Sequence, residues 1–318
     1  MTDNADRIAR QRARLTRSAA LASIAMATVL SALKIWAVLR TDSTAMLGSL
    51  ADTGLDLVAS IGTLIGVWIA AQPADEEHRF GHGKAEALAA MFQVVLISLS
   101  AVGLAVRGIT ELLAGGRVAA ANEGIVVSVI AIAGTFALLW WQRHVIVRTG
   151  SIAIKTDNVH YKSDLFLNVA VIVALVLDRY FGVAGADPVF GLAIAAWLAW
   201  GAWRASAEAI DHLMDKEWPE DKRLRFVEVA ATHPELSKLH DLRTRTSGDR
   251  DFVQFHVNLP SVMSVGEAHD VIERVEEHLC REFPGIELLI HIDPEGHIDE
   301  PGNKLAEADE FDKLEEKR

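Results

Sequence analysis

Cysteine is almost absent from this sequence of 318 residues, in which Cys280 is the only one. A single thiol excludes an intramolecular disulfide and a cluster of thiolate metal ligands, which is typical of a polar domain in a reducing compartment. Basic residues are outnumbered as well, with 31 Lys and Arg against 43 Asp and Glu and a formal net charge of −12. Because nucleic-acid binding depends on neutralising phosphates with cations, we expect no nucleic-acid partner.

Apolar residues, by contrast, are too frequent for an ordinary soluble protein: 51% of the sequence is hydrophobic and its mean hydropathy is +0.21. Positions 1–207 hold 17 basic and 15 acidic residues, whereas positions 208–318 hold 14 and 28. Seven of the eight tryptophans lie in the first part, and eight of the twelve histidines lie in the second. The sequence therefore predicts a part that lies in the lipid bilayer, followed by a polar part.

Six apolar runs are long enough to cross the roughly 30 Å of a bilayer's hydrocarbon core. The arginines at the start of the chain precede a run of about twenty residues, which is too long for a signal peptide. We interpret Lys34 and Arg107, toward the outer ends of their helices, as residues that extend to the lipid headgroups. The predicted spans are 18–39, 45–71, 86–114, 123–146, 159–181 and 186–206.

The connections near 72–85 and 143–158 carry more Lys and Arg than those near 40–44 and 115–122. The positive-inside rule then places both termini in the cytoplasm. We expect four segments: a cytoplasmic basic N-terminus at 1–17, a six-span transmembrane domain at 18–207, a cytoplasmic domain at 208–295, and a charged tail at 296–318.

The cytoplasmic segment reads as a small α/β domain. A helix is predicted over 220–231, and two strands at 241–246 and 252–259 are joined as a hairpin by Ser247-Gly248-Asp249. Ser264 and Glu267 predict a capping box at the start of a second helix, which ends before Pro284. A last strand follows at 287–292. The tail lacks a sustained apolar pattern and is expected to be solvated and disordered, although its end could form a short helix.

Two of the predicted spans contain ionisable residues, whose placement inside a bilayer costs free energy. Asp52 and Asp56 are four residues apart in the second span, and His160 and Asp164 are four apart in the fifth. Residues i and i+4 share a helix face, so two facing pairs would make a cage of four ligands that suits tetrahedral Zn²⁺. An aspartate at the centre of a spanning helix costs about 2.5 to 3.5 kcal/mol. The alternatives are hydrogen bonding across the bundle, or a position of His160 and Asp164 in water near the cytoplasmic end.

Such a cage predicts exchange of metal for protons. Crowded carboxylates without metal repel one another and hold protons, and a bound dication would expel those protons. If the helices rock so that the cage faces each side in turn, inward proton movement drives outward metal movement.

Two further histidine groups have spacings that could bind metal. Asp75, His78 and His82 follow a D-x2-H-x3-H pattern in a connection, although loop histidines are more often only solvated. In the α/β domain, strand ends and a helix face could bring histidines and one aspartate to a shared site, with plain surface positions as the alternative. The residues concerned are His240, His256, His269, His291 and Asp293.

Together these residues resemble the cation diffusion facilitator family, and within it the YiiP-type bacterial zinc/proton antiporters. The resemblance extends over residues 15–295 and includes the paired ligands of both spans. It further rests on the segments 72–75, 80–86, 240–248 and 291–294.

The resemblance implies three metal sites and a membrane six-helix bundle with a ferredoxin-like, metallochaperone-like C-terminal domain. The three implied metal sites are a transport site, a loop site and a binuclear cytoplasmic site. Ile292 departs from the family pattern, because a polar residue there can assist the binuclear site. The implied ligands are Asp52, Asp56, His160 and Asp164; Asp75, His78 and His82; and His240, His256, His269, His291 and Asp293.

The resemblance also implies a homodimer in a bacterial inner membrane, with the cytoplasmic domains meeting and Lys84 paired with Asp215. Zinc is then both cargo and regulator, since it would neutralise the facing acidic domains. Cadmium and ferrous iron remain open as cargo.

Two other readings compete with a transporter. An intramembrane metallohydrolase would also use a carboxylate and histidine site, but the sequence contains no His-Glu-x-x-His helix and no Gly-x-Ser-x-Gly turn. A membrane-tethered metal sensor would keep the cytoplasmic sites, but it would have no use for ligands inside the spans.

Overall fold

The computed structural model describes residues 2–41, 44–113, 122–181, 186–236, 238–248, 250–297 and 302–316. They form two compact units, one of residues 8–210 and one of residues 211–318 together with residues 1–7. The first is a helical bundle, and the second is an α/β domain.

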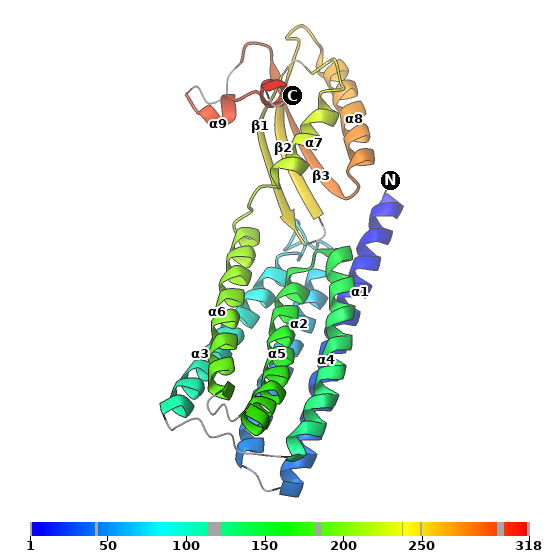
Figure 1. Ribbon diagram of the computed structural model, residues 1–318. Helices are drawn as coiled ribbons and strands as arrows, with labels where there is room; N and C mark the ends of the chain where they lie inside the picture. Colours follow the sequence, from blue (N-terminus) through cyan, green and yellow to red (C-terminus); the bar gives the residue numbers. More distant parts are fainter. Residues whose placement is uncertain are drawn as a thin grey trace. The chain divides into compact units, whose positions relative to one another are not determined.

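The bundle consists of six long helices in its described part (Figure 1). Each predicted span matches one helix, although the predicted spans 45–71 and 86–114 extend one residue beyond α2 and α3 at their ends, and α1 also includes most of the predicted basic N-terminus. The helices are α1 (Thr2–Thr41), α2 (Thr44–Ala70), α3 (Ala85–Leu113), α4 (Asn122–Thr149), α5 (Ile152–Phe181) and α6 (Ala186–Leu213).

By length and hydropathy, four described segments qualify as membrane spans: Ala9–Trp36, Thr53–Ala70, Ala85–Leu113 and Ile130–Thr149. The first half of α5 is more polar, because it holds Lys155, Asp157, Lys162 and Asp164. The hydropathy of α6 is lowered by its tryptophans. The expected class, an α-helical membrane bundle, is confirmed.

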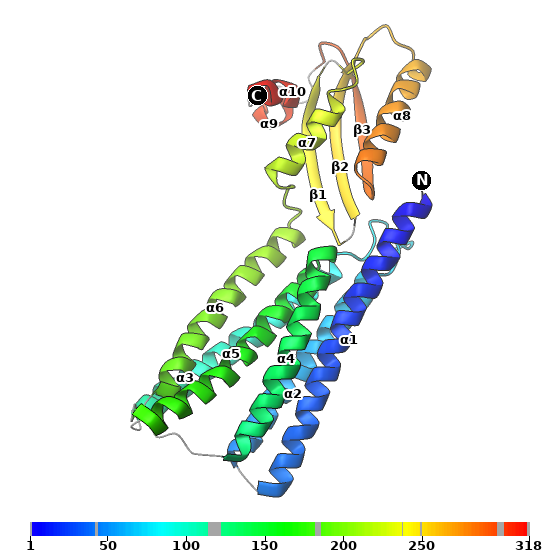
Figure 2. The ribbon, with the colours of Figure 1, turned by 45° about the vertical axis from the view of Figure 1, so that its right-hand side comes forward.

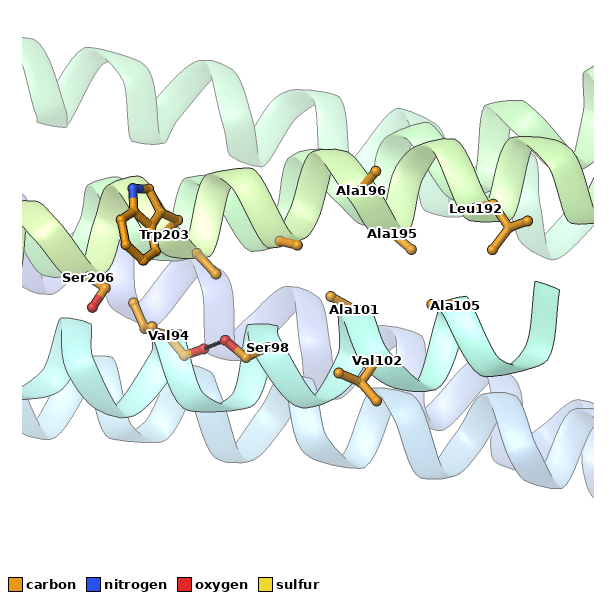
Figure 3. A pocket seen from close by; sticks show the side chains of 12 residues that line it. Val94, Ser98, Ala101, Val102, Ala105, Leu192, Ala195, Ala196, Trp203 and Ser206 are labelled. Carbon is orange, nitrogen blue, oxygen red and sulfur yellow. Dashed lines mark hydrogen bonds between the residues drawn. The ribbon is translucent and has the colours of Figure 1, made fainter. Parts of the chain in front are cut away.

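The bundle packs through small and branched apolar side chains. One buried cluster connects the first five helices, through residues such as Ala19 of α1, Val67 of α2 and Ile154 of α5. Another connects α3, α5 and α6, with Ile97 and Leu198 among its buried residues. Figure 2 shows α3 and α6 along one flank of the bundle. Between them lies a groove of about 540 Å³, lined mainly by alanines and other apolar side chains (Figure 3). A groove of this composition offers no set of ligands for a dication.

The second unit is an α/β domain with a three-stranded sheet in the order β1-β2-β3. β1 and β2 form the predicted antiparallel hairpin, while β3 returns parallel to β2 after α8. Ser264 and Glu267 form the predicted capping box at the start of α8. The elements are α7 (Glu220–Ala230), β1 (Leu239–Ser247), β2 (Arg250–Leu259), α8 (Val265–Glu282) and β3 (Ile286–Pro294).

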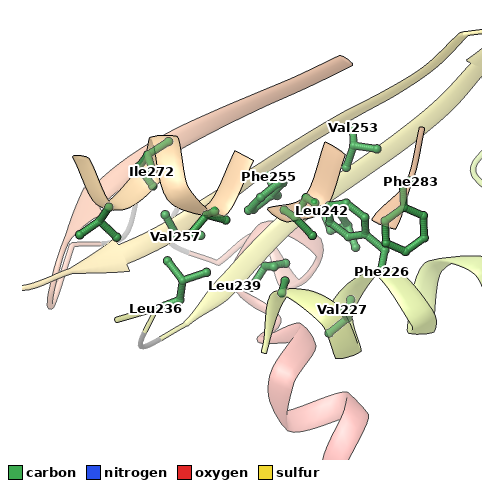
Figure 4. Packing of buried hydrophobic residues seen from close by; sticks show 14 of the residues in the cluster. Phe226, Val227, Leu236, Leu239, Leu242, Val253, Phe255, Val257, Ile272 and Phe283 are labelled. Atoms are coloured by element: carbon green, nitrogen blue, oxygen red, sulfur yellow. The ribbon is translucent and has the colours of Figure 1, made fainter. Parts of the chain in front are cut away.

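One face of this sheet forms the domain's core. Phe226 of α7 contacts Phe255 and Phe283 through its ring, and Val253 and Val257 lie two residues before and after Phe255 on β2 (Figure 4). Strand alternation therefore directs His256 to the opposite face. This leaves a polar face on which the histidines of the three strands can meet.

The tail is expected from the sequence to be solvated, with a short helix possible at its end, and its described residues contain two short helices. α9 (Lys304–Glu307) and α10 (Glu310–Glu316) follow the domain. Leu314 is buried in the domain's apolar core and Phe311 packs against it, while the Asp309 carboxylate accepts a hydrogen bond from the backbone N–H of Leu239. This segment contains too few apolar residues to show a periodic pattern in the sequence. Phe311 and Leu314 nevertheless pack it against the α/β domain.

Candidate metal centres

The aspartate of α2 and the histidine of α5 meet inside the bundle. Asp56 Oδ1 lies 2.8 Å from His160 Nε2, and Asp164 Oδ2 lies 3.8 Å from the same nitrogen. His160 is 7% exposed, while the carboxylate side chains are 16% and 23% exposed. The ligand atoms of the three residues lie within 4.8 Å of one another. This is the separation that a single small cation can bridge.

The fourth predicted ligand of this site, Asp52, has its backbone in α2, one helical turn before Asp56. Its side chain lies outside the described residues. Helix geometry places Asp52 and Asp56 on one face of α2, which leaves Asp52 as an expected ligand.

Lys34 does not extend to the headgroups as the sequence predicted. Its ammonium group donates a hydrogen bond to Thr53 Oγ1, and Thr53 is 1% exposed between Asp52 and Asp56 along α2. Arg107, in contrast, pairs with Glu111 one turn further along α3 and is 69% exposed. A fixed positive charge thus stands beside the intramembrane carboxylates.

The connection between α2 and α3 brings its three predicted ligands together. Asp75 Oδ1 lies 3.2 Å from His78 Nδ1, and Asp75 Oδ2 lies 3.3 Å from His82 Nε2. The backbone N–H of His78 donates to Asp75, which holds the pKa of this exposed carboxyl below its usual value. His82 Nδ1 lies 3.2 Å from the carbonyl oxygen of Pro73. If Nδ1 carries the proton, Nε2 is available to a metal.

Three histidines form a row across the sheet of the α/β domain. His240 is paired with His256 between β1 and β2, and His256 is paired with His291 between β2 and β3. The ring centroids are 5.3 Å and 4.5 Å apart. Each strand therefore contributes one imidazole at the same level of the sheet.

Asp293 connects the members of this row. Its Oδ2 lies 3.2 Å from His240 Nε2 and 3.0 Å from His256 Nδ1, and its Oδ1 lies 3.3 Å from His291 Nε2. The carboxylate is 2% exposed. Burial lowers the pKa of His240, which favours the neutral imidazole that binds metal.

Comparison with known proteins adds family evidence to this geometry. Residues 20–214 match the cation efflux transmembrane domain, and residues 218–295 match the cytoplasmic domain of cation efflux proteins. The chain is 41% identical over 284 residues to the cation-efflux pump FieF of Serratia proteamaculans (strain 568), with 89% of this chain and 94% of that protein covered. The chain belongs to the cation efflux family, the cation diffusion facilitators.

Other members of this family are similarly close. The FieF pump of Cronobacter sakazakii (strain ATCC BAA-894) is 42% identical over 281 residues, covering 88% of this chain and 93% of that protein. Among solved structures, a domain of CzrB, a candidate zinc transporter, is 32% identical with a TM-score of 0.24. It covers 25% of this chain and 99% of that one. The family resemblance found in the sequence is therefore confirmed.

One expected ligand of the α/β domain, His269, stands apart from its cluster. His269 is exposed on α8 and does not belong to the described group of His240, His256 and Asp293. Strand alternation places Ile292 on the face opposite His291 and Asp293. Ile292 therefore does not replace a polar side chain in this row.

Sequence reasoning missed Asp241. A β-bulge interrupts the register between His240 and Arg243, and Asp241 adopts a positive φ of 45° there. This unusual conformation brings its Oδ2 to 3.7 Å from His256 Nε2. No sequence signal distinguishes this residue except its position next to His240.

His233 and His278 also form an unexpected contact, although they showed no metal-binding pattern in the sequence. His233 Nε2 lies 2.8 Å from His278 Nδ1. Burial and the neighbouring His278 lower the pKa of His233.

Asp215 has a positive φ of 55° and accepts a hydrogen bond from Arg245 at 3.5 Å. Its expected pairing with Lys84 stays a prediction.

Proposed function

We propose that this cation efflux protein exports zinc from the cytoplasm in exchange for protons. The observation that carries the proposal is the 2.8 Å contact between Asp56 and His160, on two different helices of the bundle. Asp52 and Asp164 complete the proposed transport site. The activity of its relatives, which are named cation-efflux pumps, supports divalent cation efflux as the general function.

The ligand chemistry favours zinc as the cargo. One imidazole and three carboxylates match the tetrahedral, borderline-soft preference of Zn²⁺ better than the oxygen-only preference of Mg²⁺ or Ca²⁺. Cadmium and ferrous iron accept a similar ligand set and are the alternative cargoes.

Proton exchange follows from the same ligands. Metal can bind only to deprotonated carboxylates and to a neutral imidazole, so binding releases protons and proton uptake favours metal release. The coupling requires the site to face the two sides of the membrane in turn.

The loop and sheet centres have a proposed regulatory role. Cytoplasmic zinc would bind at the histidine row and at the loop site of Asp75, His78 and His82. Binding there would change the conformational equilibrium of the bundle according to the zinc concentration. We propose a homodimer, and His269 stays a proposed ligand of the cytoplasmic site. We also propose a bacterial inner membrane location, cytoplasmic termini and the Lys84–Asp215 pair.

Reconstitution in liposomes with a metal-sensitive dye inside tests the export function. We expect zinc flux that depends on an imposed pH gradient, and we expect Asp56→Ala to abolish it because the site loses a ligand in contact with His160. Glu111→Ala is the matched control, since this carboxylate lies at the exposed end of α3 and pairs only with Arg107 among the contacts described here.

The outcomes separate the competing functions. Zinc flux that does not depend on the pH gradient would mean that the protein is a channel or a uniporter and not an exchanger. Full flux in Asp56→Ala would refute the transport site, while retained metal binding without any flux in the unaltered protein would favour a membrane-tethered sensor. Membership of a transporter family already weighs against an intramembrane metallohydrolase.

A further inference from the structure

A second buried carboxylate lies one helical turn before His160 on α5. Asp157 is 0% exposed, and its contacts come from three other helices of the bundle. Ser23 of α1 donates to Asp157 Oδ2 at 2.6 Å, Gln142 of α4 donates to the same oxygen at 2.8 Å, and Gln93 of α3 donates to Oδ1 at 2.8 Å. These four residues are here called the Asp157 cluster.

The donors of the Asp157 cluster are all neutral. Both oxygens of the Asp157 side chain accept hydrogen bonds. Ser23, Gln93 and Gln142 are 0%, 1% and 0% exposed. Donors from three helices thus hold one buried carboxyl group, and every bond would be lost if the helices separated.

The cluster continues sideways to α2 and along α5. Gln93 also donates to Thr63 at 2.5 Å, and Asn158 donates to the side-chain oxygen of Gln142 at 3.0 Å. Tyr161 lies 3.0 Å from Ser60 Oγ and donates to the backbone carbonyl of Ser23 at 2.9 Å. Hydrogen bonds therefore join α1, α2, α3, α4 and α5 at one level.

This level lies between the proposed transport site and the end of the bundle that carries the 72–84 connection. On α2, Ser60 and Thr63 follow Asp56 toward the end of the helix at Ala70. On α5, Asp157 precedes His160 toward the start of the helix at Ile152. A cation that moves between Asp56 and that end must pass the level of the Asp157 cluster.

We propose that the Asp157 cluster is the seal that closes this end of the cation path, and that Asp157 is the positioning residue that holds it shut. The inference rests on the proposed function, because only an alternating transporter must open and close such a seal. Asp157 acts on transport by fixing α5, and hence His160, against α1, α3 and α4.

A carboxylate is suited to a seal that must also open. In the closed state it accepts hydrogen bonds from three helices at once. In the open state water enters and solvates the carboxyl group, which offsets the loss of these bonds. The closed and open arrangements are therefore close enough in free energy to be exchanged by cargo binding.

Thiol labelling tests the seal without relying on transport. Ala59→Cys in a Cys280→Ser background places a single reporter thiol on α2, at a position that is 3% exposed and shares a helix face with Asp56 and Thr63. A membrane-impermeant thiol reagent is applied from the side of the 72–84 connection. With Asp157 intact we expect slow labelling.

Asp157→Ala leaves three buried donors without their acceptor, which water satisfies in the open state. We expect labelling of Ala59→Cys to become about tenfold faster. Asp157→Asn keeps one acceptor oxygen and should give an intermediate rate. Glu111→Ala in the same background should leave the rate unchanged.

A structural role alone predicts a different result. If Asp157→Ala only loosens the fold, its thermal unfolding midpoint falls and labelling from both sides of the membrane increases equally, and this would overturn the seal. An unchanged labelling rate in a folded variant would overturn it too. Zinc flux distinguishes the two proposals: full flux in Asp56→Ala refutes the transport site, whereas side-specific labelling reports the seal by itself.

Discussion

His160 illustrates how much of this protein depends on single side chains. The spacing of His160 and Asp164 predicts that they share a helix face, and they do lie together on α5. The contact of His160 with Asp56 is a property of the bundle, because 104 residues separate the two in the chain. Ionisable side chains inside a membrane are kept where they bind something, and here they face one another.

Lys34→Met tests the fixed charge beside this site. An ammonium group near the carboxylates repels an arriving dication, so its removal should strengthen cargo binding. We expect the KM for zinc flux to fall by about tenfold, an effect that corresponds to roughly 1.4 kcal/mol. Initial flux rates over a range of zinc concentrations measure it.

Arg107→Met is the control for Lys34→Met, since Arg107 pairs with Glu111 at the exposed end of α3. It should leave the KM unchanged. A KM that rises in Lys34→Met would show that the lysine supports the site through Thr53 instead of opposing the cargo.

At the scale of elements, α5 and β1 show how function disturbs regular structure. α5 has a polar first half because it carries both His160 and the buried Asp157. β1 contains a bulge that turns the Asp241 carboxylate toward His256. Both departures cost stability, and both place polar groups where metal or hydrogen bonds compensate for the cost.

The C-terminal helix α10 makes a testable contribution to the domain. Leu314 is 6% exposed in the apolar core next to β1. Leu314→Ala would remove buried methyl groups and leave a cavity, which should destabilise the attachment of α10 by about 2 kcal/mol. We expect faster hydrogen exchange in β1, near Leu239, because the segment that carries Asp309 would detach more often.

The matched control for Leu314→Ala is Leu289→Ala, since Leu289 is 63% exposed on β3. It should leave exchange in β1 unchanged. Equal exchange in the unaltered chain and in Leu314→Ala would mean that α10 does not protect this strand.

At the scale of the whole molecule, the chain combines a bundle that contains one candidate metal centre with a domain that contains another. Their chemistry differs: the centre in the bundle is rich in carboxylates, and the centre on the sheet is rich in imidazoles. A histidine-rich centre in an acidic domain is suited to sensing the metal that the bundle moves.

His256→Ala tests that division of roles. It removes the central imidazole of the row, so zinc should no longer bias the bundle through the domain. We expect the zinc concentration for half-maximal flux to rise severalfold with the maximal flux preserved, as measured in proteoliposomes. His297→Ala, at an exposed position beyond the row, should behave as the unaltered protein. A loss of maximal flux in His256→Ala would indicate a role in folding.

The amino-acid sequence by itself determined the membrane bundle, the α/β domain, the hairpin, the capping box and the local ligand pairs, because these depend on hydropathy, periodicity and spacings within one element. Only the tertiary structure decided that Asp56 meets His160, that Lys34 points to Thr53, that Asp157 joins four helices and that α10 packs on the domain. Such contacts depend on how elements lie against one another, which no spacing along the chain specifies.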